Sequence, residues 1–308
     1  MLLVKTLLLF TAFLAAFTCT TSAASYWKHN ENQGQVHACH SFSLIALIEA
    51  EYYRKTGKRI NLSERDLFIR HYSKGNPRQL VQQHLQAAAS KRLPEHYAET
   101  GHISENFKIL TRYGVASEKE LPFGSFFGGS VESSVRALRS QRTRITREAL
   151  QLKSQGRWSR KTAQFLITKH SQKLSKVRQY CNLPATTPTR TWTKNWISSY
   201  RLVKKSSQGI GHTKSSLIQQ LRYRPVAVDI HNFHELQRSK ALTISRHSLV
   251  VSQYHPRTDE FSIRCSSATH IDRVPANTLS KGVYQYYYLS PKSSSNILSY
   301  TWLKLFQW

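Results

Sequence analysis

Residues 32–43 decide the fold of this chain, and they read Asn-Gln-Gly-Gln-Val-His-Ala-Cys-His-Ser-Phe-Ser. The stretch places one cysteine, Cys39, at the start of a long apolar segment, with Gln33 six residues before it. Because a helix N-terminus lowers the pKa of a thiol through its dipole and its free N–H groups, Cys39 is a candidate nucleophile. The side-chain amide of Gln33 is a candidate donor to an oxyanion that forms beside it.

The segment that starts at Cys39 is predicted to be a buried helix over residues 39–56. Apolar residues lie on nearly every side of it, which is typical of a helix inside a core, and Gly57 is suited to end it. A short helix is expected after Ser63, which resembles an N-cap. Further helices are expected over 78–92 and 104–113.

The opening run resembles the active-site segment of papain-like cysteine peptidases, whose pattern is Gln-Gly-x-Cys-Gly-Ser-Cys-Trp-(Ala/Ser)-Phe-Ser. Six positions match it in register: Gln33, Gly34, Cys39, Ser41, Phe42 and Ser43. Val36 replaces a cysteine that the family uses in a disulfide, and His37 and His40 replace the usual Gly and Trp. The resemblance extends to further segments: 56–64, 100–101, 106–123, 225–230 and 246–251.

The resemblance implies the two-lobed α+β fold of the papain-like family. A helical N-terminal lobe with the nucleophile is expected over residues 24–125, and a β-rich C-terminal lobe with the catalytic histidine over 206–308. Residues 126–205 are interpreted as a basic, mostly helical insertion and connection. After Pro184 the pattern changes from helices to strands, which β-branched and aromatic residues between turn residues predict at 225–230, 248–254, 260–264 and 282–290.

The resemblance also implies which residues form the site. Cys39 is the nucleophile, and His247, at the start of Arg-His-Ser-Leu-Val-Val (246–251), is the base. An imidazole beside Cys39 is expected to hold it as an activated thiolate at neutral pH. Gln33 contributes to the oxyanion hole. Gly101 stands where the family has a Gly-Gly pair, so it is a candidate for substrate binding.

The third catalytic member departs from the family pattern. The family orients its histidine with the Asn of Lys-Asn-Ser-Trp-Gly, whereas residues 263–267 read Ile-Arg-Cys-Ser-Ser here. Cys265 takes the Asn position, so Cys265 and Ser266 are the candidates for the orienting residue. Because loss of an orienting residue weakens such a site, three outcomes stay open: a weakened peptidase, another orienting residue, or a peptidase fold without activity.

The N-terminus and the cysteines indicate the compartment. Residues 1–23 have the charged start, apolar centre and small-residue end of a secretory signal peptide, which predicts a secreted or periplasmic protein. Their apolar run is too short for a transmembrane helix, so no transmembrane segment is expected in the mature chain. The three remaining cysteines argue against a disulfide scaffold, although a single Cys181–Cys265 bridge is compatible with export.

No metal or other cofactor is expected. The histidines and cysteine at positions 37–40, and the histidines at 231 and 234, lack the second matched Cys/His pair of a structural zinc site.

The charge of the chain predicts how it meets its partners. The formal net charge is +28, and residues 131–180 hold 13 of the 45 Lys and Arg against two acidic residues. A strongly positive field attracts nucleic acid, anionic membranes, acidic glycans or acidic substrates. The segment 131–181 is predicted to form two helices broken near 154–156. It is either a docking surface for an anionic partner or a solvated helical pair in a generally basic protein.

Three functions compete. The leading hypothesis is a secreted papain-like cysteine endopeptidase that hydrolyses a protein or peptide substrate through a Cys–His thioester mechanism. The alternative is a catalytically weak or inactive papain-fold protein that binds anionic partners through its basic surface. A Cys–His amidase, peptidoglycan hydrolase or acyltransferase shares the order of the two residues, but the Gln33–Cys39 spacing and the Leu-Ser-Glu turn at 62–64 favour a papain relative.

Overall fold

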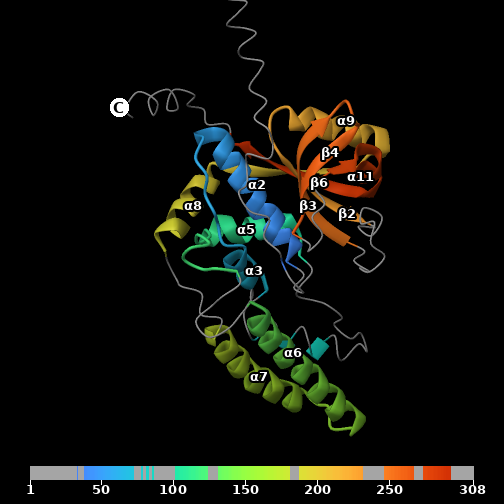
Figure 1. The fold of residues 1–308 in the computed structure, drawn as a ribbon. Helices are drawn as coiled ribbons and strands as arrows, with labels where there is room; N and C mark the ends of the chain where they lie inside the picture. Colours follow the sequence, from blue (N-terminus) through green and yellow to red (C-terminus); the bar gives the residue numbers. More distant parts are fainter. Residues whose placement is uncertain are drawn as a thin grey trace, which may run out of the picture.

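The computed structural model describes residues 33, 38–72, 78, 81–82, 85–86, 101–123, 131–180, 187–231, 246–266 and 273–292. Helices dominate the first part of the described chain and an antiparallel sheet dominates the last, so the architecture is α+β (Figure 1). The helices are α2 (Cys39–Thr56), α3 (Glu64–Tyr72), α5 (Ile103–Tyr113), α6 (Val131–Ser154), α7 (Arg160–Tyr180), α8 (Pro188–Ser198), α9 (Ile210–Leu221) and α11 (Ala276–Gly282). The strands are β1 (Tyr200–Ser206), β2 (Val226–His231), β3 (Arg246–His255), β4 (Glu260–Arg264), β5 (Arg273–Pro275) and β6 (Val283–Pro291).

The sheet has six strands in the order β1-β6-β2-β3-β4-β5, and all neighbours are antiparallel. In the β2–β3 pair, Asp229 lies opposite Ser248 and Ile230 lies opposite His247. Because successive side chains of a strand point to opposite faces, this register puts Asp229 and Ser248 together on one face. The pair Ile230 and His247 shares the other.

Helices cover both faces of the central strands, which explains the apolar runs 226–228 in β2 and 249–251 in β3. One face packs on α2, α5 and α8 through a cluster that includes Leu44, Leu110, Ile197, Ala227 and Val250. The opposite face packs on α9 and α11 through a cluster that includes Leu217, Val228, Leu249, Phe261 and Leu279. The sheet thus forms the wall against which α2 is held.

Helix α2 has the bounds that the sequence predicts. Gly57 ends it in a left-handed conformation with φ 68°, and its N–H bonds to Tyr53 O at 2.7 Å. The buried Glu49 ties the helix to its surroundings, because its carboxylate accepts from Leu62 N at 2.9 Å and pairs with Arg264 at 3.2 Å. These contacts fix the position of α2 relative to β4.

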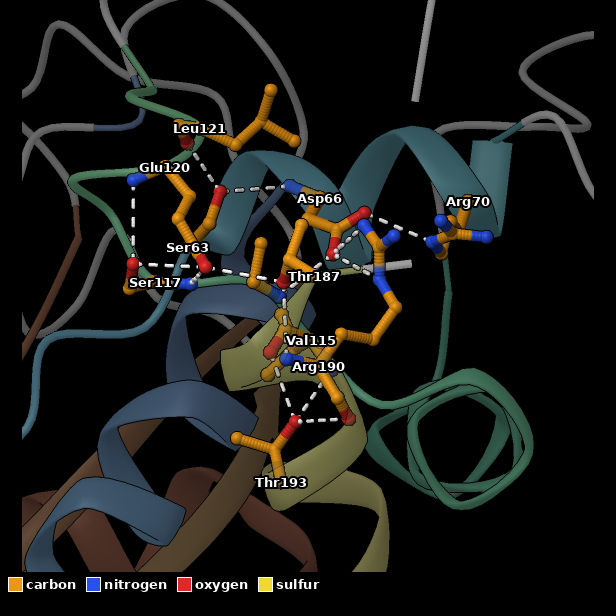
Figure 2. Close-up of polar contacts among 11 residues, drawn as sticks. Ser63, Asp66, Arg70, Val115, Ser117, Glu120, Leu121, Thr187, Arg190 and Thr193 are labelled. Atoms are coloured by element: carbon orange, nitrogen blue, oxygen red, sulfur yellow. Dashed lines mark hydrogen bonds and ion pairs between the residues drawn. The ribbon is translucent and has the colours of Figure 1, made fainter. Parts of the chain in front are cut away.

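A second buried carboxylate, Asp66, joins the helices around α2 (Figure 2). It accepts from Arg190 at 2.6 Å, from Arg70 at 2.9 Å and from Ala116 N at 2.8 Å. Ser63 caps α3 by accepting from Asp66 N at 3.0 Å, as the sequence predicts. A buried carboxylate is tolerated when charge partners and N–H donors satisfy it, so Asp66 links α3 to α8 across 124 residues of sequence.

The basic segment forms a helical hairpin, α6–α7, as predicted, with its break at residues 155–159. Polar contacts of Gln141 with His170 at 2.8 Å, and of Glu148 with Lys169 at 2.7 Å and His170 at 3.1 Å, join the two helices. Apolar side chains of the hairpin share one buried cluster with residues of α2 and α3: Phe42, Phe68, Val135, Leu138 and Leu174. No helix of the described ranges has the length and apolarity needed to cross a bilayer.

Several elements differ from the sequence-based expectation. The segment after Pro184 does not begin with strands: α8 covers 188–198, because Thr187 caps it and Pro188 occupies the first turn, where a proline is favourable. Strand β1 begins at residue 200, inside the segment interpreted as a helical connection. Helices α9 and α11 were not expected. The predicted helix at 78–92 lies mostly outside the described residues.

Candidate active site

Cys39 is the first residue of α2, and the end of β3 that carries Ser248 lies against it. Its thiol is half-buried and unoxidised. The pKa of Cys39 is raised from 9.0 to about 11, mainly by burial; the nearby charge of Asp229 adds to this rise, and backbone and side-chain hydrogen bonds from Ser248 oppose it. The thiol is therefore neutral at pH 7. This differs from the thiolate that the helix N-terminus suggests, because desolvation outweighs the helix dipole.

His247 lies near the start of β3 and is 3% exposed. Its Nε2 is 3.1 Å from the sulfur of Cys265, the residue that follows β4. Burial lowers the pKa of His247 from 6.5 to about 3, so the imidazole is neutral at physiological pH. Of the two sequence candidates for an orienting residue, Cys265 is the one that contacts this ring.

Gln33 is brought to the same region from 233 residues away. Its backbone N–H donates to Ser266 O at 2.9 Å, and its Oε1 accepts from Ser266 Oγ at 2.8 Å. Because the amide oxygen of Gln33 bonds to Ser266, its NH₂ group is directed away from Ser266. Ser266 thus contacts the glutamine and not the imidazole, although the sequence made it a candidate for orienting His247.

Gly101 packs against two histidines. A Cβ at this position would lie 2.3 Å from His40 Cδ2 and 2.6 Å from His71 Nε2, so only glycine fits. His40 itself is 1% exposed, and its Nδ1 is 3.1 Å from Asn106 Nδ2. The structure therefore puts His40 in a buried polar cluster with Ser41, Asn106 and His71.

Sequence reasoning missed one part of the site, a buried network on β2, β3 and β6. Asp229 accepts from Ser248 Oγ at 2.5 Å and from Tyr287 OH at 2.9 Å. Burial raises the pKa of this carboxyl group above its usual value. The available signal was an acidic residue in the middle of the apolar strand Val226–His231, which only a buried hydrogen-bonded carboxyl group explains.

The described residues contain no group of three or more His, Cys, Asp or Glu side chains that could hold a metal ion. Cys265 forms no disulfide bond with another described residue. Cys181, the other half of the disulfide considered from sequence, lies outside the described residues, as do residues 1–23 and 34–37.

Known proteins resemble this chain in fold but not in sequence. No protein-family model matches it, and no curated protein matches its sequence. The crystal structure of PepW from Lactobacillus rhamnosis HN001 has a TM-score of 0.59 at 12% identity, covering 90% of this chain and 83% of that one. The Carica candamarcensis cysteine protease CMS1MS2 bound to E-64 has a TM-score of 0.45 at 13% identity, covering 87% and 95%.

The bromelain protease from Ananas comosus, also bound to E-64, has a TM-score of 0.43 at 13% identity, with 87% of this chain and 95% of that chain covered. The architecture of this chain is the papain-like α+β fold. At this level of identity the similarity defines the fold alone.

Proposed function

We propose that this protein is a secreted papain-like cysteine endopeptidase with Cys39 as its nucleophile and His247 as its general base. One observation carries the proposal. Two consecutive residues, Cys265 and Ser266, contact the histidine and the glutamine that the mechanism needs. These neighbouring contacts after β4 support a shared arrangement of the proposed base and the proposed oxyanion donor.

The neutral state of both groups determines how the reaction starts. Cys39 Sγ forms a bond to the scissile carbonyl carbon while its proton passes to the ring of His247, and the carbonyl electrons move onto oxygen. Because Nε2 faces Cys265, the ring exchanges this proton through Nδ1. The amide of Gln33 and the backbone N–H of Cys39 stabilise the oxyanion.

The second half of the cycle returns the protein to its starting state. The tetrahedral intermediate collapses, and the amine leaves with the proton that His247 gives back, which leaves a thioester on Cys39. Water then attacks the thioester, with His247 again accepting and returning the proton. The acid product leaves and the thiol is restored, so no cofactor is consumed.

A second candidate function is a weak or inactive relative on the same fold. The raised pKa of Cys39 and the lowered pKa of His247 favour it, because a stable neutral pair lacks the thiolate that makes cysteine peptidases fast. The sulfur of Cys265 is also a weaker hydrogen-bond acceptor than an amide oxygen. Measured turnover decides between the two candidates.

Cleavage of a mixed peptide library by the purified protein tests the proposal. We expect the wild type to cut internal peptide bonds, Cys39→Ala to abolish cutting, and His247→Ala to reduce it by at least 100-fold, in the range of general-base losses. Ser43→Ala on the same helix is the matched control and should retain turnover. Cleavage that survives Cys39→Ala would refute the mechanism, and a folded wild type without cleavage would select the inactive candidate.

Export is a separate part of the proposal. The signal-like composition of residues 1–23 supports it. N-terminal sequencing of protein recovered from outside the cytoplasm should find a mature end close to residue 24, whereas an intact Met1 would contradict export by this route.

A further inference from the structure

The α6–α7 hairpin extends away from the sheet, and the turn between its helices lies at the end far from β1–β6 (Figure 1). Its base is buried against α2 and α3 through Val135, Leu138 and Leu174. The hairpin tip, residues 150–165, includes the end of α6, the turn and the start of α7. The tip is therefore an exposed part of the protein that the proposed peptidase chemistry does not use.

The charge of the hairpin tip is strongly positive. Arg157, Arg160 and Lys161 are all exposed, and residues 150–165 contain no acidic residue. The nearest acidic residue, Glu148, is engaged by Lys169 at 2.7 Å and by His170 at 3.1 Å. No neighbouring carboxylate in the tip sequence neutralises these cations, so they present a compact positive surface.

Large apolar side chains lie among these cations. Phe165 is 62% exposed and Leu150 is 38% exposed. Lys169 Nζ lies 5.9 Å from the ring centre of Phe165, and Lys153 Nζ lies 5.9 Å from that of the half-buried Trp158. Exposed aromatic and aliphatic residues next to Lys and Arg are the combination found in segments that bind at a membrane interface.

We propose that the hairpin tip docks onto an anionic phospholipid surface. Arg157, Arg160 and Lys161 attract the anionic headgroups, and Phe165 and Leu150 enter the boundary between headgroups and acyl chains. A nucleic acid would use the same cations, but sequence-tolerant binding of single strands needs a row of stacking aromatics. The tip offers one largely exposed aromatic side chain, Phe165, and one partly exposed aliphatic side chain, Leu150, so a lipid surface fits better.

The proposal does not depend on the reactivity of Cys39. Sedimentation of the full chain with vesicles of phosphatidylcholine and phosphatidylglycerol tests it, with phosphatidylcholine vesicles as reference. We expect binding to the anionic vesicles alone, weakened by added salt. The triple variant Arg157→Gln, Arg160→Gln, Lys161→Gln should bind on the order of 100-fold more weakly, since each cation near an anionic surface contributes about fivefold.

A matched triple variant of three exposed cations on the edge strand β1, Arg201→Gln, Lys204→Gln, Lys205→Gln, removes the same charge elsewhere and should change binding by a few-fold at most. Phe165→Ser should weaken binding about tenfold through lost apolar burial alone. Circular dichroism checks that each variant is folded. Equal binding to neutral vesicles would overturn the proposal, and so would an equal loss of binding in the β1 variant. Displacement of the vesicles by added nucleic acid, together with normal vesicle binding by Phe165→Ser, would also overturn it.

Discussion

At the scale of single residues, the candidate site combines a neutral thiol, Cys39, with a neutral imidazole, His247. Burial moves the pKa of Cys39 up to about 11 and that of His247 down to about 3. The sequence predicted both residues through short matched segments, but it predicted a thiolate, because the helix N-terminus is visible in a sequence and the desolvation is not. Proton transfer therefore has to accompany the attack on substrate.

The burial of His247 predicts a pH dependence of stability. Its pKa is 6.5 when exposed and about 3 in the folded chain, so the folded state binds this proton more weakly than the unfolded state. The stability that neutral His247 contributes is present above pH 6.5 and is lost as the pH falls toward 3. Urea titrations measure the free energy of unfolding at each pH. Between pH 6.5 and 4 the decrease in this free energy should be ~3 kcal/mol smaller in His247→Gln than in the wild type. If His247→Gln lost stability with falling pH as the wild type does, His247 would not be the group responsible.

Cys265 predicts a gain of function. Its sulfur lies 3.1 Å from His247 Nε2, where an amide oxygen would accept a stronger hydrogen bond. We expect Cys265→Asn to raise kcat/KM about fivefold, which corresponds to about 1 kcal/mol, a typical net hydrogen-bond contribution. Cys265→Ala, which removes the acceptor, should lower kcat/KM by a similar factor. If both variants had the same kcat/KM, Cys265 would not orient the ring.

At the scale of elements, the sequence predicted those with a strong apolar pattern. Helix α2 and strand β4 have the predicted bounds, because apolar residues and clear stop signals define them. Strand β1 was missed since its sequence, Tyr-Arg-Leu-Val-Lys-Lys-Ser, is mostly exposed at the edge of the sheet. Helix α9 was missed because only Thr213 and Leu217 are buried in it. Such elements are defined by strand pairing and by helix packing against residues that are distant in the sequence.

Two glycines that end helices differ in backbone conformation and in packing. Both have φ 68°, but ψ is 0° at Gly57 and −173° at Gly114, a region that only glycine readily adopts. A Cβ on Gly57 would meet nothing within 4 Å, whereas one on Gly114 would lie 1.9 Å from Arg190 O. Gly57→Ala should cost about 1 kcal/mol from the left-handed conformation alone, and Gly114→Ala should cost at least ~3 kcal/mol, because the backbone of α8 must move. Chemical denaturation measures both, and equal costs would contradict the close approach of α8.

At the scale of the whole molecule, the fold resembles PepW with a TM-score of 0.59 although only 12% of residues are identical. The core clusters on both faces of the sheet maintain the architecture, because many combinations of apolar residues fill them equally well. The sequence marks Asp229 as an acidic residue in an apolar strand but does not identify its partners Ser248 and Tyr287, since the network assembles residues from three strands. The α6–α7 hairpin is the part that carries the proposed lipid contact.

The central claim is that Cys39 becomes a nucleophile through His247. The most direct measurement is labelling of the protein with an epoxysuccinyl probe, followed by mass mapping of the modified cysteine, with Cys39→Ala and His247→Ala as controls. Cys265, which is 5% exposed, is the internal reference thiol. We predict modification of Cys39 alone, and its loss in His247→Ala. Slow, equal labelling of all cysteines, unchanged in His247→Ala, would contradict the claim.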